Sequence, residues 1–196
     1  LRMIHLHSLE IEEAIKVNNF LYNKDSTNLR NIDGLWFFPY HRRDFEMSFK
    51  NAQLYEKKVL DSKGDTIYNA LIGSLYLKNG MKEKGNEHIQ GALNYCQLYI
   101  DENIPFSQRK WVNGLLAGIY SMQNKKDEAL KQLSIMSSSR KTMNRLVPFQ
   151  IKQMLMYDNI RNEPEYKDII NELDRKYRKE HDRVKKLLFN EGLVPE

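Results

Sequence analysis

Cysteine is nearly absent from this sequence, with Cys96 alone among 196 residues. A single cysteine excludes an internal disulfide framework and a zinc site built from several thiolates. It leaves the compartment open, because a protein without disulfides can function on either side of a membrane; the cytoplasm is our preferred location. Long apolar runs are also missing. The longest extends only from Leu35 to Tyr40, so no segment approaches the length of a membrane span.

A secretory signal peptide is absent as well. Because the chain begins with Leu1, we expect a trimmed precursor or a domain of a longer protein. What the chain does contain is ample apolar material, with 41% hydrophobic and 11% aromatic residues, too much for a disordered protein. Its length fits one domain or one short repeat array.

Charge of one sign does not dominate, since 31 Lys and Arg face 26 Asp and Glu for a net charge of +5. The second half is more basic, with 18 basic and 14 acidic residues after position 98. Its densest basic run, 174–186, is interleaved with acids, whereas nucleic-acid binders cluster basic residues on one face. The pattern favours a solvated helix face over a phosphate-binding strip, so nucleic acid is not the expected partner.

Apolar spacing predicts an all-α protein, because no stretch shows the alternation of β-strands. The five prolines fall where helices should begin or end. The expected helices are 8–23, 43–61, 65–79, 82–101, 106–123, 126–137, 141–157 (broken near Pro148) and 164–190.

Residues 24–42 form the one long connection expected between these helices. The segment contains four aromatic residues between Trp36 and Tyr40. A connection of this length inside a domain is either functional or folded onto the core. One interpretation is an aromatic lid or docking surface; the other, which we prefer, is that the rings pack over the ends of the first helices.

Two segments 44 residues apart share a pattern of small and aromatic residues. The first contains Gly73, Tyr76, Gly85, Ile89 and Ala92, and the second contains Ala117, Tyr120, Ala129 and Leu133. Small residues allow two helices of a hairpin to cross closely, and each hairpin leaves an apolar flank for the next one to cover. Gly80 and Asn124 mark the turns, where a left-handed backbone is expected.

This pattern resembles the tetratricopeptide repeat (TPR) family, although Asn69 and Asn113 stand where that family has tryptophan. The resemblance implies a TPR-like helical-hairpin array, a right-handed α-solenoid. We expect one domain with N-terminal helices at 1–61, where 8–23 and 43–61 form a degenerate repeat, two units at 65–138, and capping helices at 139–196. Residues 156–167 resemble the segment that closes many bacterial TPR arrays, which makes 164–190 a long C-terminal capping helix.

The sequence contains no recognised catalytic, phosphate-binding or metal-binding motif. None of its five histidines has a partner at ligand spacing, and Cys96 lies in an apolar pattern typical of a small core residue. We therefore expect no metal, no cofactor and no enzymatic activity in this chain itself.

The TPR resemblance implies a concave groove lined by the first helix of each pair. The candidate groove residues are Ile67, Ala70, Ser74, Leu77, Lys78, Trp111, Gly114, Gly118, Ser121 and Met122. Gly114 and Gly118 follow Trp111 on one helical face and leave a shelf beside its ring. A neighbouring helix or a ligand must fill this shelf. We expect an external apolar or aromatic group, with Trp111 as a binding hot spot; otherwise Trp111 is a core residue.

The leading functional hypothesis is a protein–protein interaction domain, a scaffold that binds a peptide or a neighbouring domain in its groove. The second is a regulatory or substrate-positioning C-terminal domain of a larger bacterial enzyme or transcription regulator. The third is a helical-repeat nucleic-acid binder. A catalytic or DNA-binding domain upstream in the full-length gene would favour the second.

Overall fold

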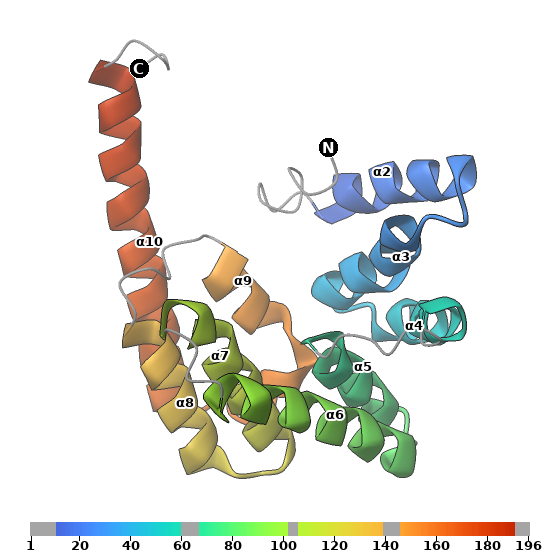
Figure 1. Ribbon diagram of the computed structural model, residues 1–196. Coiled ribbons are helices and arrows are strands. Elements are labelled where there is room, and N and C mark those ends of the chain that lie inside the picture. The colour runs from blue at the N-terminus through green and yellow to red at the C-terminus, as the bar shows by residue number, and fades with distance from the viewer. Residues whose placement is uncertain (1–10, 60–66, 102–105, 139–145, 191–196) are drawn as a thin grey trace.

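The computed structural model describes residues 11–59, 67–101, 106–138 and 146–190, without the side chains of 59, 67, 106–111 and 146–148. These ranges contain helices and no β-strand, which confirms the all-α prediction. The helices are α2 Ile11–Lys24, α3 Leu29–Arg42, α4 Phe45–Val59, α5 Ile67–Lys78, α6 Lys82–Asp101, α7 Phe106–Met122, α8 Lys126–Ser138, α9 Leu146–Gln153, the 3₁₀ turn η1 Leu155–Tyr157, and α10 Pro164–Asn190 (Figure 1). The bounds of α6 and α10 are those predicted.

Helices that follow one another along the chain pack in pairs: α3 with α4, α5 with α6, and α7 with α8. Figure 1 shows the pairs side by side in chain order, with α2 next to α3 at one end. At the other end, α10 packs against α8 and α9 and then extends past the other helices. Its buried residues, Tyr166, Ile170 and Leu173, all lie in its first half.

The three pairs share one turn geometry. The first helix of each pair is followed closely by a residue with a positive φ: Arg43 (65°), Gly80 (76°) and Asn124 (59°). In each case the next residue donates its N–H to the carbonyl five positions back: Asp44 to Pro39 at 3.0 Å, Met81 to Tyr76 at 3.0 Å, and Lys125 to Tyr120 at 2.9 Å. This hydrogen bond closes the helix end in a Schellman motif. The predicted left-handed turns at Gly80 and Asn124 are confirmed.

A small buried residue follows each left-handed residue after five positions: Ser48, Gly85 and Ala129. At the α5–α6 crossing, a Cβ atom on Gly73 would lie 3.0 Å from the Gly85 carbonyl oxygen. The two backbones therefore approach too closely for a larger residue. This confirms the predicted close crossing, and Ser48 reveals the same position in the α3–α4 pair.

The prediction of a long connection at 24–42 is wrong, because residues 29–42 form α3. Gly34 interrupts the helical pattern of the sequence, yet it is required by the close approach of α2. A Cβ atom on Gly34 would lie 2.0 Å from Asn18 Oδ1, and Asn18 donates to the Asn31 carbonyl at 3.0 Å. The sequence predicts a degenerate repeat formed by 8–23 and 43–61. In the structure, α4 pairs instead with α3.

Pro39 lies inside α3 and deprives the Leu35 carbonyl of its usual helical donor. Asn51 of α4 supplies a replacement, since its Nδ2 donates to the Leu35 oxygen at 2.9 Å. Trp36 and Tyr40 have no exposed surface. The aromatic residues therefore belong to the core, as we preferred, and not to a lid.

The helix expected at 141–157 is also divided differently from the prediction. Its described part consists of α9 and η1, separated at Met154, whose backbone is extended (φ −65°, ψ 129°). Pro148 lies in the first turn of α9, where a missing N–H removes no helical hydrogen bond. The break therefore comes at Met154, six residues later than expected. It places η1 against α5 and α7.

Candidate functional site

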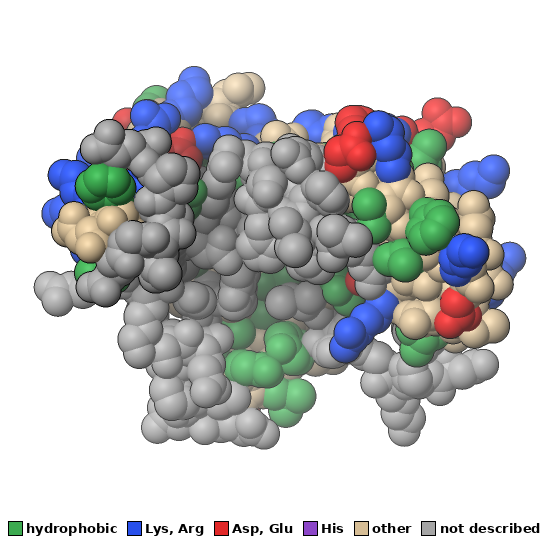
Figure 2. All heavy atoms as spheres, turned by 90° about the horizontal axis from the view of Figure 1, so that it is seen from above, with side chains coloured by type: hydrophobic (Ala, Val, Ile, Leu, Met, Phe, Trp, Pro, Cys, Tyr) green, Lys and Arg blue, Asp and Glu red, His purple; other side chains and the backbone are tan. Residues whose placement is uncertain are grey.

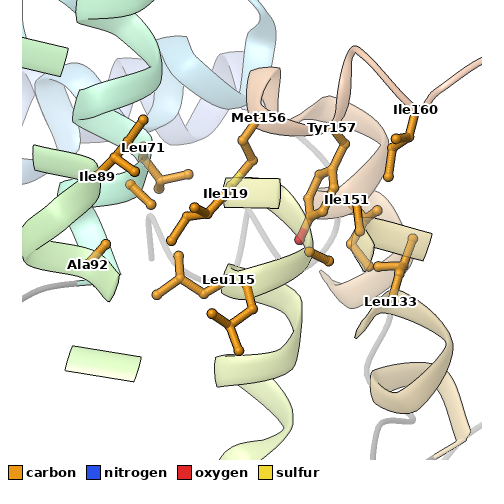
Figure 3. Close-up of a cluster of buried hydrophobic side chains, with 14 of the residues drawn as sticks. Leu71, Ile89, Ala92, Leu115, Ile119, Leu133, Ile151, Met156, Tyr157 and Ile160 are labelled. Carbon is orange, nitrogen blue, oxygen red and sulfur yellow. The ribbon is translucent and has the colours of Figure 1, made fainter. Parts of the chain in front are cut away.

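The face formed by α3, α5 and α7 carries a later part of the same chain, which we call the inner segment (residues 146–160). Within it, α9 contacts α3, and η1 contacts both α5 and α7. Figure 3 shows Met156 and Tyr157 pointing toward the side of α7 that carries Leu115 and Ile119. The face predicted to form an open groove is therefore largely occupied.

The predicted groove residues separate into three groups. Ala70, Ser74, Gly114, Gly118 and Ser121 are buried, whereas Leu77 and Met122 are half-buried and Lys78 is exposed. The side chains of Ile67 and Trp111 lie outside the described residues, so the expectation about Trp111 stays a prediction.

The shelf beside the α7 glycines is filled by the chain itself. A Cβ atom on Gly118 would lie 2.0 Å from Cε of Met156, and one on Gly114 would lie 2.9 Å from Sδ of Met136. Tyr157 also donates its hydroxyl to the Gly114 carbonyl at 2.8 Å. The expectation that an external group occupies this shelf is therefore corrected. The reason is that the extended residue Met154 brings η1 onto α7.

Tyr40 fixes the main chain of the inner segment to two helices, α3 and α5. Its hydroxyl oxygen accepts from the Leu155 N–H at 3.1 Å and lies 3.0 Å from Oγ of Ser74. Burial raises the pKa of Tyr40 well above its ordinary value, so the hydroxyl stays protonated. Tyr40 thus joins α3, α5 and η1 at a single oxygen.

A clasp of two arginines and one aspartate holds the ends of α9 and η1. Arg43 donates two hydrogen bonds to the carboxylate of Asp158, at 3.1 and 2.8 Å, and a third to the Gln153 carbonyl at 3.1 Å. Arg161 donates to Asp158 at 2.7 Å and to the Met154 carbonyl at 3.0 Å. Partial burial works to raise the pKa of Asp158, but the two arginines hold it below its ordinary value.

An apolar pocket of about 270 Å³ remains between the preceding helices and the inner segment. Its walls come from α3, α5, α7, α8 and the inner segment, and none of the described residues that line it is charged. The lining residues are Phe37, Tyr68, Leu71, Gly114, Leu115, Met136, Gln150, Ile151, Met154, Met156 and Tyr157. The inner segment therefore narrows the expected groove to a pocket.

A second cluster of polar groups joins α4, α5 and α6. Glu56 is buried, accepts a hydrogen bond from Tyr76, and lies 2.7 Å from Nε2 of His88. Lys84 donates to the Tyr76 hydroxyl at 2.6 Å. Burial works to raise the pKa of Glu56, but the hydrogen bonds from His88 and Tyr76 hold it below its ordinary value. Each group already has a partner, so the cluster is suited to joining three helices.

Other reactive chemistry is sparse in the described ranges. Burial raises the pKa of the Cys96 thiol to about 12, which keeps it protonated and unreactive. Among the described residues, no group of three or more His, Cys, Asp or Glu side chains could hold a metal ion. No described helix is long and apolar enough to span a membrane.

Sequence reasoning missed most of the pocket, because its walls come from five separate parts of the chain. Among the described lining residues, Gly114 alone was also a groove candidate. A partial signal existed in residues 156–167, where Asp158 and Arg161 belong to the array-closing pattern. That pattern indicated the end of an array, but not that these side chains bind Arg43 and the main chain of α9.

Comparisons with known proteins add no relative to this picture. Searches with protein-family models, among curated proteins and among solved structures each found no match to this chain.

Proposed function

We propose that this chain is a TPR-like helical-repeat domain that binds a peptide or a neighbouring domain, with α10 as its capping helix. The repeated turn at Arg43, Gly80 and Asn124 supports the repeat assignment. The buried small residue five positions after each turn supports it independently. The proposed role is interaction and not catalysis by this chain.

The observation that carries the proposal is the seating of the inner segment on α3, α5 and α7. The array holds this segment by its main chain: Tyr40 accepts from the Leu155 N–H, and Arg43 donates to the Gln153 carbonyl. Contacts of this kind suit an arbitrary peptide, because every peptide offers main-chain N–H and carbonyl groups. A partner would meet the remaining apolar pocket and place an anchor side chain there.

Selection from a displayed peptide library tests this function with the purified chain. We expect selected peptides to share a large apolar residue. Gln150→Arg, which introduces a cation at the half-buried pocket wall, should weaken their binding at least about tenfold. Gln90→Arg on the exposed surface of α6 is the matched control and should leave binding unchanged. A library that yields no specific binder, or binders insensitive to Gln150→Arg, contradicts the proposal.

A further inference from the structure

The pocket between the array and the inner segment has a size and chemistry that indicate its occupant. We propose that it binds a neutral bicyclic aromatic group, the indole ring of a partner tryptophan, with Gln150 accepting the indole N–H. This inference rests on the proposed function, because it names the anchor that the interaction domain recognises.

The volume of the pocket sets the size of the group. A dry apolar cavity of about 150 Å³ accommodates benzene. The pocket here measures about 270 Å³, nearly twice that volume. A single ring or a short aliphatic side chain would leave much of the space empty and lose contacts with the walls. Two fused rings fill it better.

The lining determines the polarity of the group. Met136, Met154 and Met156 present polarizable sulfur-containing side chains, which favour contact with aromatic rings. Phe37 and Tyr68 contribute aromatic walls. A charged ligand would lose its hydration here without gaining a partner of opposite charge among the described lining residues. The pocket therefore favours a neutral ring.

The hydroxyl groups at the pocket already have partners. Tyr157 donates to the Gly114 carbonyl, and Tyr68 donates to Asp33 at 3.2 Å. By contrast, the half-buried side-chain amide of Gln150 makes no hydrogen bond in the part of the chain that the structure describes. Its carbonyl oxygen can accept one hydrogen bond. An indole has a single N–H donor, which can donate to the side-chain carbonyl oxygen of Gln150.

Tryptophan also suits the anchoring role on general grounds. Aromatic residues, and tryptophan above all, are enriched among the few interface residues that dominate binding. The pocket walls are held in advance, because Tyr40 fixes Leu155 and the Arg43–Asp158–Arg161 clasp fixes the end of α9. A preformed pocket reduces the ordering cost of binding.

Small probes test the pocket without any partner. We expect indole and N-acetyl-tryptophanamide to bind the full chain with dissociation constants below about 1 mM, as observed by NMR titration. Benzene should bind at least about tenfold more weakly. The charged naphthalene-2-carboxylate should also bind at least about tenfold more weakly than neutral naphthalene, because the described residues that line the pocket include no cation.

Two kinds of variant locate the binding. Gln150→Leu removes the acceptor and should weaken indole binding about fivefold or more while leaving naphthalene binding unchanged, with Gln90→Leu as control. Leu115→Trp should fill the pocket and abolish both. Because Leu115 is buried, Met154→Trp at the half-buried wall is a second filling variant. Absence of indole binding, or equal binding by all folded variants, overturns the inference.

The two proposals fail in different ways. Library peptides that bind through the pocket without an aromatic anchor, together with no indole binding, would overturn the indole inference and leave the interaction function standing. Indole binding that responds to Gln150→Leu, together with a library that yields no binder, would contradict the interaction function and support the pocket chemistry.

Discussion

His41 lies at the end of α3 in surroundings that disfavour its protonated form. It has no exposed surface, and neither ring nitrogen has a hydrogen-bond partner among the described residues. Phe37 lies against it, with ring centroids 4.5 Å apart, and Phe149 lies 6.2 Å away. Burial lowers the pKa of His41 from 6.5 to about 4, because the charged form would lose its hydration.

The first prediction is that acid weakens the fold through His41. Below pH 6.5 the unfolded chain binds a proton at this residue while the folded chain does not, so stability falls until about pH 4. The loss reaches at most about 3 kcal/mol. His41→Phe should remove this component. The unfolding free energy of the variant minus that of the parent should therefore increase as the pH falls from 7 to 5. Urea denaturation at both values measures it, and parallel pH dependence would contradict the prediction.

Asn51 and Pro39 form a pair in which one residue compensates for the other. The second prediction is that Asn51→Ala destabilises the chain by about 1–2 kcal/mol, because the Leu35 carbonyl loses its donor. In a Pro39→Ala background the main-chain N–H of residue 39 can restore that donor, so Asn51→Ala should cost less. Chemical denaturation of the four chains gives the coupling energy. Gln53→Ala on the same helix serves as a control and should change stability by under about 0.5 kcal/mol; an equal cost in both backgrounds would refute the pairing.

At the scale of elements, the α5–α6 crossing depends on two facing glycines. The third prediction is that Gly73→Leu destabilises the fold by about 1–3 kcal/mol, because the side chain would meet the Gly85 carbonyl and Ile89. Gly80→Asn is a contrasting change, since nothing lies within 4 Å of an added Cβ atom and asparagine tolerates a left-handed backbone, as Asn124 does. Thermal unfolding should separate the two variants. Similar midpoints for both would argue against the crossing.

The two halves of α10 differ in how far their apolar side chains are buried. The first half buries Tyr166, Ile170 and Leu173 against α8 and α9. In the second half, the stripe of apolar residues that begins at Tyr166 continues to Val184, which is exposed. The same stripe therefore packs where the body of the molecule is present and remains uncovered where the helix extends past it (Figure 1).

At the scale of the whole molecule, many basic side chains are neutralised locally. In α10, Arg175 pairs with Glu172 at 2.8 Å and Arg183 with Glu180 at 2.6 Å. Asp174 pairs with Lys152 of α9 at 2.5 Å. Figure 2 shows both signs of charge around small groups of hydrophobic side chains on one face.

The fourth prediction follows from this mixing of charges. Affinity for a generic DNA duplex should be negligible at physiological salt, because nonspecific binding requires unpaired basic groups that displace counterions. Fluorescence anisotropy with a labelled duplex at several salt concentrations measures this. Tight binding with a steep salt dependence would contradict it and promote the nucleic-acid hypothesis.

Apolar spacing and helix-ending residues act locally, so the all-α class and the bounds of α6 and α10 could be predicted before the fold was known. The sequence also located the left-handed turns at Gly80 and Asn124. It could not reveal α3, since Gly34 and Pro39 read as helix breakers until Asn18 and Asn51 are placed beside them.

The site shows the same division. Gly114 and Gly118 indicated a vacancy on α7, because glycine removes side-chain volume at any helix surface. Which group fills that vacancy depends on Met156, 38 positions after Gly118 and brought back by the extended backbone at Met154. This contact could be identified only in the folded chain, because contacts between distant residues follow from how the chain turns and not from local spacing.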